Sequence, residues 1–162
     1  MKSIFELSIL AISLLTIATC NRKENSDHAG GWLQGTEQEK FDAVANQLRG
    51  FDVAMVETGY RYQELYWAGI DKNWDYANYQ IEKISVAIEN GLERRPKRAA
   101  SAESFLTDAL PAMEKIVKQR DSTTFLQGMQ TLTTSCNACH AKEKVPFFTV
   151  NLPVTRQSPI RK

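Results

Sequence analysis

The sequence predicts an all-α protein, arranged as an antiparallel four-helix bundle, and three observations support this fold class. Apolar residues recur at three- and four-residue steps through most of residues 38–145, which is the period of amphipathic helices. No segment shows the alternation of apolar and polar residues that a half-buried strand requires, and no internal repeat is visible. Helices with short connections between them pack best as an antiparallel bundle.

Length, composition and charge are those of an ordinary globular protein. The 162 residues, of which 43% are hydrophobic and 24% charged, are enough for one domain and little more. The formal net charge is only +1 and no basic stripe dominates the chain, so we expect no nucleic acid partner.

The N-terminal segment is typical of an export signal. Lys2 provides a positive start, and residues 4–19 are mostly apolar or small, although Glu6 interrupts them. This stretch is too short for a stable membrane span. Residues 1–19 are therefore interpreted as a signal peptide and excluded from the fold.

The residues around the expected cleavage point resemble a bacterial lipobox. Residues 17–20 read Ile-Ala-Thr-Cys, which predicts that Cys20 becomes the lipidated first residue and tethers an exported, periplasmic protein to a membrane. The alternative is an ordinary signal peptide with an incidental cysteine, since Thr19 departs from the usual Gly, Ala or Ser. Residues 20–37 are polar and without periodicity, which indicates a flexible tether.

The first helix is expected to begin near residue 38 and to end before the turn at residues 69–73. Its apolar face is formed by Phe41, Val44, Leu48, Phe51, Met55 and Tyr62. Gly50 and Gly59 interrupt this helix but need not end it, because a glycine inside a helix costs only about 1 kcal/mol relative to alanine. We therefore expect one helix whose apolar face lies in the core.

The second helix has clear boundary residues. Asp71 or Asn73 is the expected N-cap, and Pro96 ends the helix because the residue before a proline is disfavoured in helical geometry. Its apolar stripe consists of Trp74, Ala77, Ile81, Ile84, Ile88 and Leu92.

The third and fourth helices differ in how clearly they begin. The third follows Ser101, and Pro111 should either kink it or begin it after a separate short turn. The fourth begins at Asp121, a good N-cap. Its apolar stripe consists of Phe125, Met129, Leu132, Cys136 and Cys139. Residues 146–162 contain three prolines and no periodicity, and are predicted to form an extended tail.

The segment Cys136-Asn137-Ala138-Cys139-His140 has the spacing of a haem attachment site. Two thiols that add to the two vinyl groups of one porphyrin must lie close together, and the adjacent imidazole must reach the iron from the same segment. On a helix, residues three and four apart are neighbours, so Cys136, Cys139 and His140 project from one side. We predict one covalently attached haem c on the last helix, with His140 as an iron ligand.

Other uses of these cysteines are less well supported. A zinc site needs four good ligands, and apart from Cys20 the chain offers only two cysteines and two histidines, His140 and the tether residue His28. A thioredoxin-like dithiol would require a strand–helix context that the sequence lacks. In an oxidising compartment Cys136 and Cys139 could also form a simple disulfide.

An export signal, a four-helix pattern and a C-x-x-C-H motif on the last helix together resemble the class II cytochromes c, which include cytochrome c′ and the low-spin cytochromes similar to cytochrome c556. The resemblance covers residues 38–145, and the long tail departs from the usual short ending. It implies that His140 is the proximal ligand. It also implies either a methionine from the first helix on the opposite side of the iron or, as in cytochrome c′, an apolar side chain that leaves the iron five-coordinate.

Met55 is the expected second ligand, because it lies on the apolar face of the first helix. The alternatives are Met113, or no protein ligand with Met55 as core filler. Met129 is on the helix of His140 and would struggle to reach the opposite face of the haem. Arg61 is a candidate partner for a haem propionate, or else a solvated surface arginine.

The resemblance implies an electron-transfer protein outside the cytoplasmic membrane, with a five-coordinate haem that binds NO or CO as the alternative function. We expect no enzymatic turnover, because no nucleophile–base pair and no second histidine are present in the predicted folded region. The partners would be redox proteins, and the resemblance allows a homodimer. A basic cluster could steer an acidic partner, contact anionic lipid or form a solvated loop. It consists of Arg94, Arg95, Lys97 and Arg98.

Overall fold

The predicted all-helical class is confirmed for the part of the chain that the structure describes. The structure, a computed structural model, describes residues 31–157, in which helices are joined by turns and irregular segments and no strand occurs. The chain divides into two compact units, one that ends at Leu48 and one that begins at Arg49. The predicted signal peptide, the lipidation site Cys20 and most of the tether lie outside the described residues.

The first unit contains helix α2 (Glu37–Gln47), which begins with a capping box. The Thr36 hydroxyl accepts from the Glu39 backbone N–H at 3.3 Å, and the Glu39 carboxylate accepts from the Thr36 N–H at 2.7 Å. These hydrogen bonds from Thr36 hold the pKa of Glu39 below its usual value. Two orphan N–H groups are therefore satisfied at the start of this helix.

The expectation of a single first helix with a buried face was wrong. Helix α2 ends before Arg49, whose φ is 56°, and Gly50 is the N-cap of the next helix, α3 (Phe51–Ile70). The α2 residues expected in the core are exposed, Phe41 by 71% and Leu48 by 55%. The helical period continues across the break, but the left-handed conformation of Arg49 separates the two stripes, and only the later one is buried.

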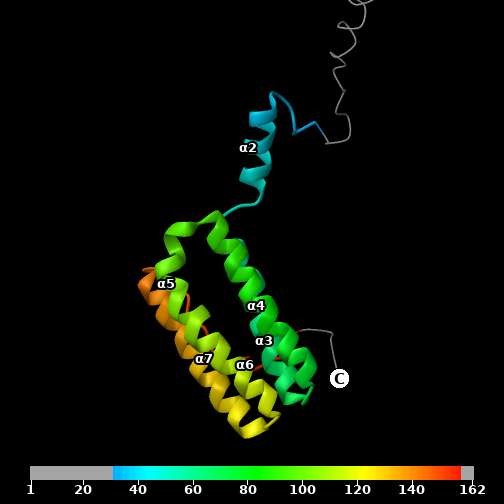
Figure 1. The fold of residues 1–162 in the computed structure, drawn as a ribbon, viewed down its shortest axis with the longest axis vertical. Coiled ribbons are helices and arrows are strands. Elements are labelled where there is room, and N and C mark those ends of the chain that lie inside the picture. The colour runs from blue at the N-terminus through cyan, green and yellow to red at the C-terminus, as the bar shows by residue number, and fades with distance from the viewer. Residues whose placement is uncertain (1–30, 158–162) are drawn as a thin grey trace, which may run out of the picture. The chain divides into compact units, whose positions relative to one another are not determined.

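Helices α3 and α4 (Trp74–Arg94) form the most extensive helix pair of the second unit, and Figure 1 shows them side by side. They approach closely because Gly91 faces Ala54, where an added Cβ would lie 2.6 Å from the alanine methyl carbon. Asn73 caps α4 by accepting from the Tyr76 N–H at 3.3 Å, whereas Asp71 ends α3. The predicted end of this helix before Pro96 is confirmed.

The third predicted helix consists of several helical segments. A 3₁₀ turn (Pro96–Arg98) leads into α5 (Ala99–Ser104), a π-helical segment (Phe105–Ala109) and α6 (Leu110–Gln119). The Leu110 N–H bonds to the Phe105 carbonyl across the wide turn. Because this turn directly precedes Pro111, it accommodates a residue that has no N–H and whose ring crowds the preceding carbonyls.

Helix α7 (Ser122–Lys142) begins at the predicted cap. The Asp121 carboxylate accepts from the backbone N–H and the hydroxyl of Thr124, both at 2.7 Å. Helix α7 packs against α6, α3 and α5, and α6 packs against α4. The core between these helices is closed by fully buried side chains, the largest being Phe125, Leu65, Ile84, Met113, Met129 and Leu132. In residues 31–157, no helix is both long and apolar enough to cross a membrane.

The described chain after α7, up to residue 157, has turns and irregular structure, and it packs against the helices. Lys144, with φ 62°, ends the helix so that the Val145 N–H bonds to the His140 carbonyl at 2.9 Å. This is a Schellman turn, which reverses the chain direction. Val150 and Leu152 then pack against the core, and Arg156 forms a bidentate pair with Asp71 at 2.7 and 2.8 Å.

Candidate functional site

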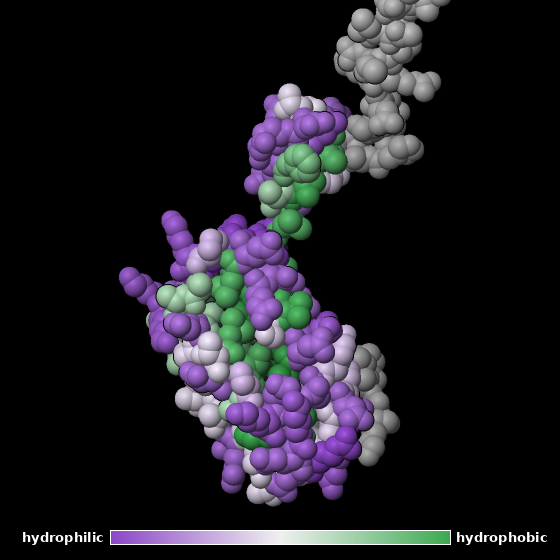
Figure 2. All heavy atoms as spheres, in the orientation of Figure 1, coloured by the Kyte–Doolittle hydropathy of each residue, from purple (hydrophilic) through white to green (hydrophobic). Residues whose placement is uncertain are grey.

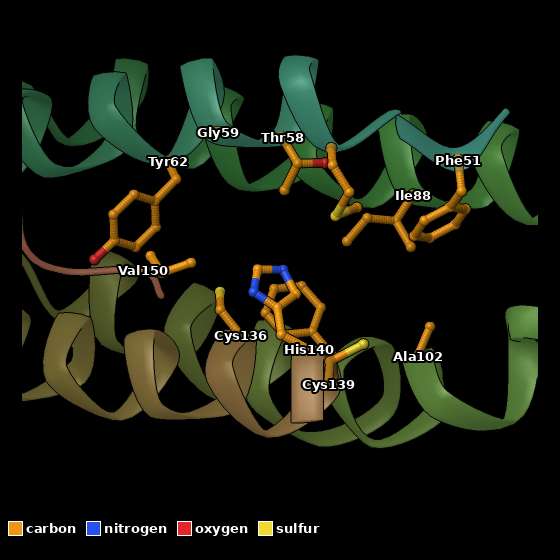
Figure 3. A pocket seen from close by; sticks show the side chains of 12 residues that line it. Phe51, Thr58, Gly59, Tyr62, Ile88, Ala102, Cys136, Cys139, His140 and Val150 are labelled. Atoms are coloured by element: carbon orange, nitrogen blue, oxygen red, sulfur yellow. The ribbon is translucent and has the colours of Figure 1, made fainter. Parts of the chain in front are cut away.

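An apolar pocket lies between the start of α3 and the end of α7. It encloses about 110 Å³, or about 610 Å³ with its open mouth included. In Figure 3, helices α3 and α4 form one wall, and α7 and α5 form the other. Figure 2 shows hydrophobic residues exposed as a strip on this unit between α4 and α5. The lining residues are Phe51, Met55, Thr58, Gly59, Tyr62, Ile88, Ala102, Phe105, Cys136, Cys139, His140 and Val150.

The structure brings Cys136, Cys139 and His140 together on the α7 wall. In Figure 3 the imidazole of His140 points into the pocket, with one cysteine sulfur on either side of it. Both thiols are free, and Cys136 packs against the hydrophobic core. The helical spacing of three and four residues produces this arrangement, since these positions share one face.

Both cysteines favour the neutral thiol. Burial, together with the neighbouring Cys139, raises the pKa of Cys136 to about 12. Burial also raises the pKa of Cys139, although Lys142 and Arg98 oppose this shift. A zinc site would require thiolates. Among the described residues, no group of three or more Cys, His, Asp and Glu side chains is placed to hold a metal ion.

Met55 lines the same pocket from α3, whereas His140 lines it from α7. It is partly buried against the core. Met113 and Met129 are almost completely buried elsewhere in the core and do not line the pocket. Of these three methionines, Met55 is therefore the one that lines the pocket together with His140.

Arg61 does not line the pocket. Its guanidinium donates to the Glu57 carboxylate at 3.3 Å and to the Gln80 amide oxygen at 3.5 Å. It also lies over the ring of Tyr60 at 5.5 Å from the ring centre. The side chain is thus engaged between α3 and α4, and its pairing with a haem propionate stays a prediction.

Several pocket residues were not identified from the sequence. Thr58 follows Met55 by three residues, so the helical period could have indicated it, whereas Tyr62 belongs to the apolar face predicted from the sequence. The Tyr62 hydroxyl lies 2.6 Å from that of Thr133, while the buried Thr58 hydroxyl has no partner. Val150 lies in a segment without periodicity, and no local pattern could have placed it in the pocket.

The C-terminal segment also contacts the motif itself. Nδ1 of His140 lies 2.5 Å from the carbonyl oxygen of Phe148. The side chain of Asn137, between the two cysteines, donates to the Val150 carbonyl at 2.9 Å and accepts from the Val150 N–H at 2.8 Å. The imidazole is therefore held from its outer edge while its other nitrogen remains available.

The pocket fits a covalently attached haem by its chemistry. Its walls are mainly apolar, its two thiols are free and neutral, and its imidazole lies between them. Gly59 leaves room on the α3 wall, because a Cβ added there would meet no atom within 4 Å. An apolar site with a few convergent polar groups is the usual form of a cofactor pocket.

Comparisons with models of known protein families, with curated proteins and with solved structures found no match to this chain. The class of protein is therefore defined by its own features. It is an all-helical protein with an apolar pocket that presents two free thiols and a histidine.

Proposed function

We propose that this protein is a monohaem c-type cytochrome similar to the class II group, and that it carries electrons outside the cytoplasmic membrane. The observation that supports this most directly is the α7 wall of the pocket, where Cys136, Cys139 and His140 face an apolar space together. In this proposal an antiparallel bundle of four helices encloses one haem c. The four are α3, α4, the combined α5 and α6, and α7.

Cys136 and Cys139 would hold the haem by thioether bonds. Each thiol would add across one vinyl group, with an S–C bond formed and the thiol proton transferred to the other vinyl carbon, so this attachment would consume no oxidant or reductant. His140 would bind the iron through Nε2, because its Nδ1 is engaged by Phe148.

Met55 is proposed as the ligand on the opposite side. When bound, the haem supplies an iron that alternates between Fe(III) and Fe(II). A methionine–histidine pair raises the potential of such an iron, and the apolar walls around Ile88 and Phe105 exclude water and favour the reduced form further. An electron carrier needs only an iron that changes its oxidation state and a pocket that sets its potential, so no enzymatic turnover is proposed.

Binding of NO or CO is the second candidate function. It would require an open iron, and the space beside Gly59 is the observation that favours it. In that case Met55 would be only a partly buried lining residue, and the pocket would admit a small apolar ligand on the α3 side.

The proposed location rests on the N-terminal sequence. Residues 1–19 would direct export and be removed, and lipid on Cys20 would anchor the protein through residues 21–36 in the periplasm. The partners would be redox proteins, and a second copy of the chain is a further candidate. Arg94 and Lys97 belong to a basic cluster that would attract an acidic partner.

The test is expression of the full chain together with haem-attachment machinery. Colour that persists after denaturation would demonstrate covalent haem, and Cys136→Ser with Cys139→Ser should abolish it. Sharp reduced bands and the weak long-wavelength ferric band of sulfur ligation would indicate a methionine–histidine carrier. Broad high-spin bands that sharpen with CO would favour gas binding, and a colourless wild-type protein would contradict both functions.

A further inference from the structure

The segment after α7 contacts the motif on α7 as well as the hydrophobic core. We propose that residues 146–152 hold His140 in one tautomer and one orientation through the Phe148 carbonyl, and that Asn137 positions this segment. This inference rests on the proposed function only in assigning the iron to the other imidazole nitrogen. The sequence predicts only an extended tail for residues 146–162.

The hydrogen-bond partner decides the tautomer. A backbone carbonyl oxygen can only accept, so the contact of 2.5 Å with Nδ1 requires the proton on Nδ1. The lone pair of the neutral ring is then on Nε2. Figure 3 shows the ring pointing into the pocket, so the nitrogen with the lone pair is available to a metal there.

The carbonyl is itself held at two points. On one side, Lys144 in the left-handed conformation turns the chain back, and the Phe148 N–H bonds to the Val145 carbonyl at 3.0 Å. On the other side, Asn137 makes two hydrogen bonds to the backbone of Val150, at 2.9 and 2.8 Å. Phe148 lies between these two points, so its carbonyl has little freedom to leave His140.

Packing supports the same position. The side chain of Val150 lines the pocket, and Val150 and Leu152 are packed against the hydrophobic core. Farther along, Arg156 pairs with Asp71 and lies over the ring of Trp67, 4.8 Å from its centre. The chain after Phe148 is thus anchored by both apolar and polar contacts.

The consequence for a bound iron is electronic as well as geometric. A hydrogen bond from Nδ1–H to a carbonyl makes the imidazole a stronger donor, and a stronger donor stabilises Fe(III) relative to Fe(II). Asn137 would therefore lower the potential without touching the haem. It is a positioning residue that acts through Val150 and Phe148.

Two full-length variants separate this role from packing. Asn137→Ala removes both hydrogen bonds to the backbone of Val150 and leaves the side chain of Val150 in place. Val150→Ala removes the apolar side chain and leaves both backbone hydrogen bonds in place. Only Asn137→Ala should change the tautomer of His140.

The first readout needs no haem. Nitrogen NMR of the imidazoles in the full chain, recorded at alkaline pH, reports which ring nitrogen of His140 carries the proton. We expect the Nδ1–H tautomer for His140 in the wild type and in Val150→Ala, and a shift toward Nε2–H in Asn137→Ala. Exchange of the Val150 N–H should become about tenfold faster in Asn137→Ala, as loss of a hydrogen bond implies. An Nε2–H ring in the wild type, or an unchanged ring in Asn137→Ala, would overturn the proposal.

The second readout is the midpoint potential of the haem-loaded protein. Asn137→Ala should raise it, whereas Val150→Ala, which opens the pocket to water, should not. A potential that is the same in Asn137→Ala and in the wild type would refute the electronic role. If the wild type binds no haem, the proposed function fails, while the tautomer measurement still decides whether Phe148 holds His140.

Discussion

Gly69 on α3 lies directly against the ring of Phe125 on α7, so that a Cβ added to Gly69 would overlap the ring carbons. Phe125 is fully buried, and its ring also meets Trp74 edge to face, with ring centres 5.7 Å apart. The absence of a side chain at Gly69 therefore sets how closely α3 and α7 approach at the end of the unit opposite the pocket.

Gly69→Ala should destabilise the protein by about 1–3 kcal/mol, because the extra methyl group overpacks a closed core. Denaturant unfolding of the haem-free chain measures this loss. Gly59→Ala is the matched control, since a Cβ at that helical position meets nothing and should be neutral or stabilising by up to about 1 kcal/mol. Equal effects of the two substitutions would show that the contact with Phe125 does not matter.

Met55→Leu should abolish the long-wavelength ferric band of sulfur ligation and lower the midpoint potential, because Met55 is the methionine that lines the pocket. Met113→Leu is the control. It replaces a methionine buried in the core, so it should leave the spectrum unchanged. The comparison of ferric spectra is decisive, and a band that persists in Met55→Leu would exclude this residue as the ligand.

Tyr76 should make the protein sensitive to alkaline pH. Burial raises its pKa well above the usual value of 10, and the Glu64 carboxylate, which accepts from its hydroxyl at 2.8 Å, raises it further. A pKa that is higher in the folded state stabilises the protein fully below pH 10. This stabilisation is lost as the pH rises through the folded-state value.

Tyr76→Phe should therefore cost about 1–3 kcal/mol at pH 7, where buried Glu64 loses its donor, and progressively less above pH 10. Denaturant unfolding at a series of pH values measures the difference from wild type. Tyr79→Phe removes the hydroxyl of an exposed tyrosine next to it and is the control. A difference that stays constant between pH 7 and pH 11 would contradict the assignment.

Arg156→Ala should lower the free energy of unfolding by about 1–2 kcal/mol, because it breaks a bidentate pair whose side chains are only 17% and 23% exposed. Arg120→Ala offers a matched control, since the pair of Arg120 with Asp75 is 62% and 89% exposed and should contribute little. Faster proteolysis after residue 145 in Arg156→Ala alone would support anchoring of the tail. Similar losses in both variants would argue against it.

Local sequence signals predicted the boundaries of α4 and α7 well. Asn73 and Asp121 are the N-caps, and the end before Pro96 is as expected, because capping and proline geometry depend on neighbours within a few residues. Local spacing also predicted the arrangement of the motif on α7, because residues four apart, such as Cys136 and His140, lie on one face of a helix.

The break between α2 and α3 had no comparable local signal. The intrinsic cost of a glycine in a helix is small, and that cost alone does not decide whether a helix continues at Gly50. The residues from Phe51 onward pack into the core of the second unit, and the new helix begins there.

The sequence by itself determined the helical class, the caps and the cluster of two thiols and one imidazole, since these depend on residues close together along the chain. Only the tertiary structure decided that Met55 and Val150 line the same pocket as His140, and that Arg61 is engaged with Glu57. The physical reason is separation along the chain. The contact of Asp71 with Arg156, for example, joins residues 85 positions apart, and no periodicity or spacing in the sequence predicts it.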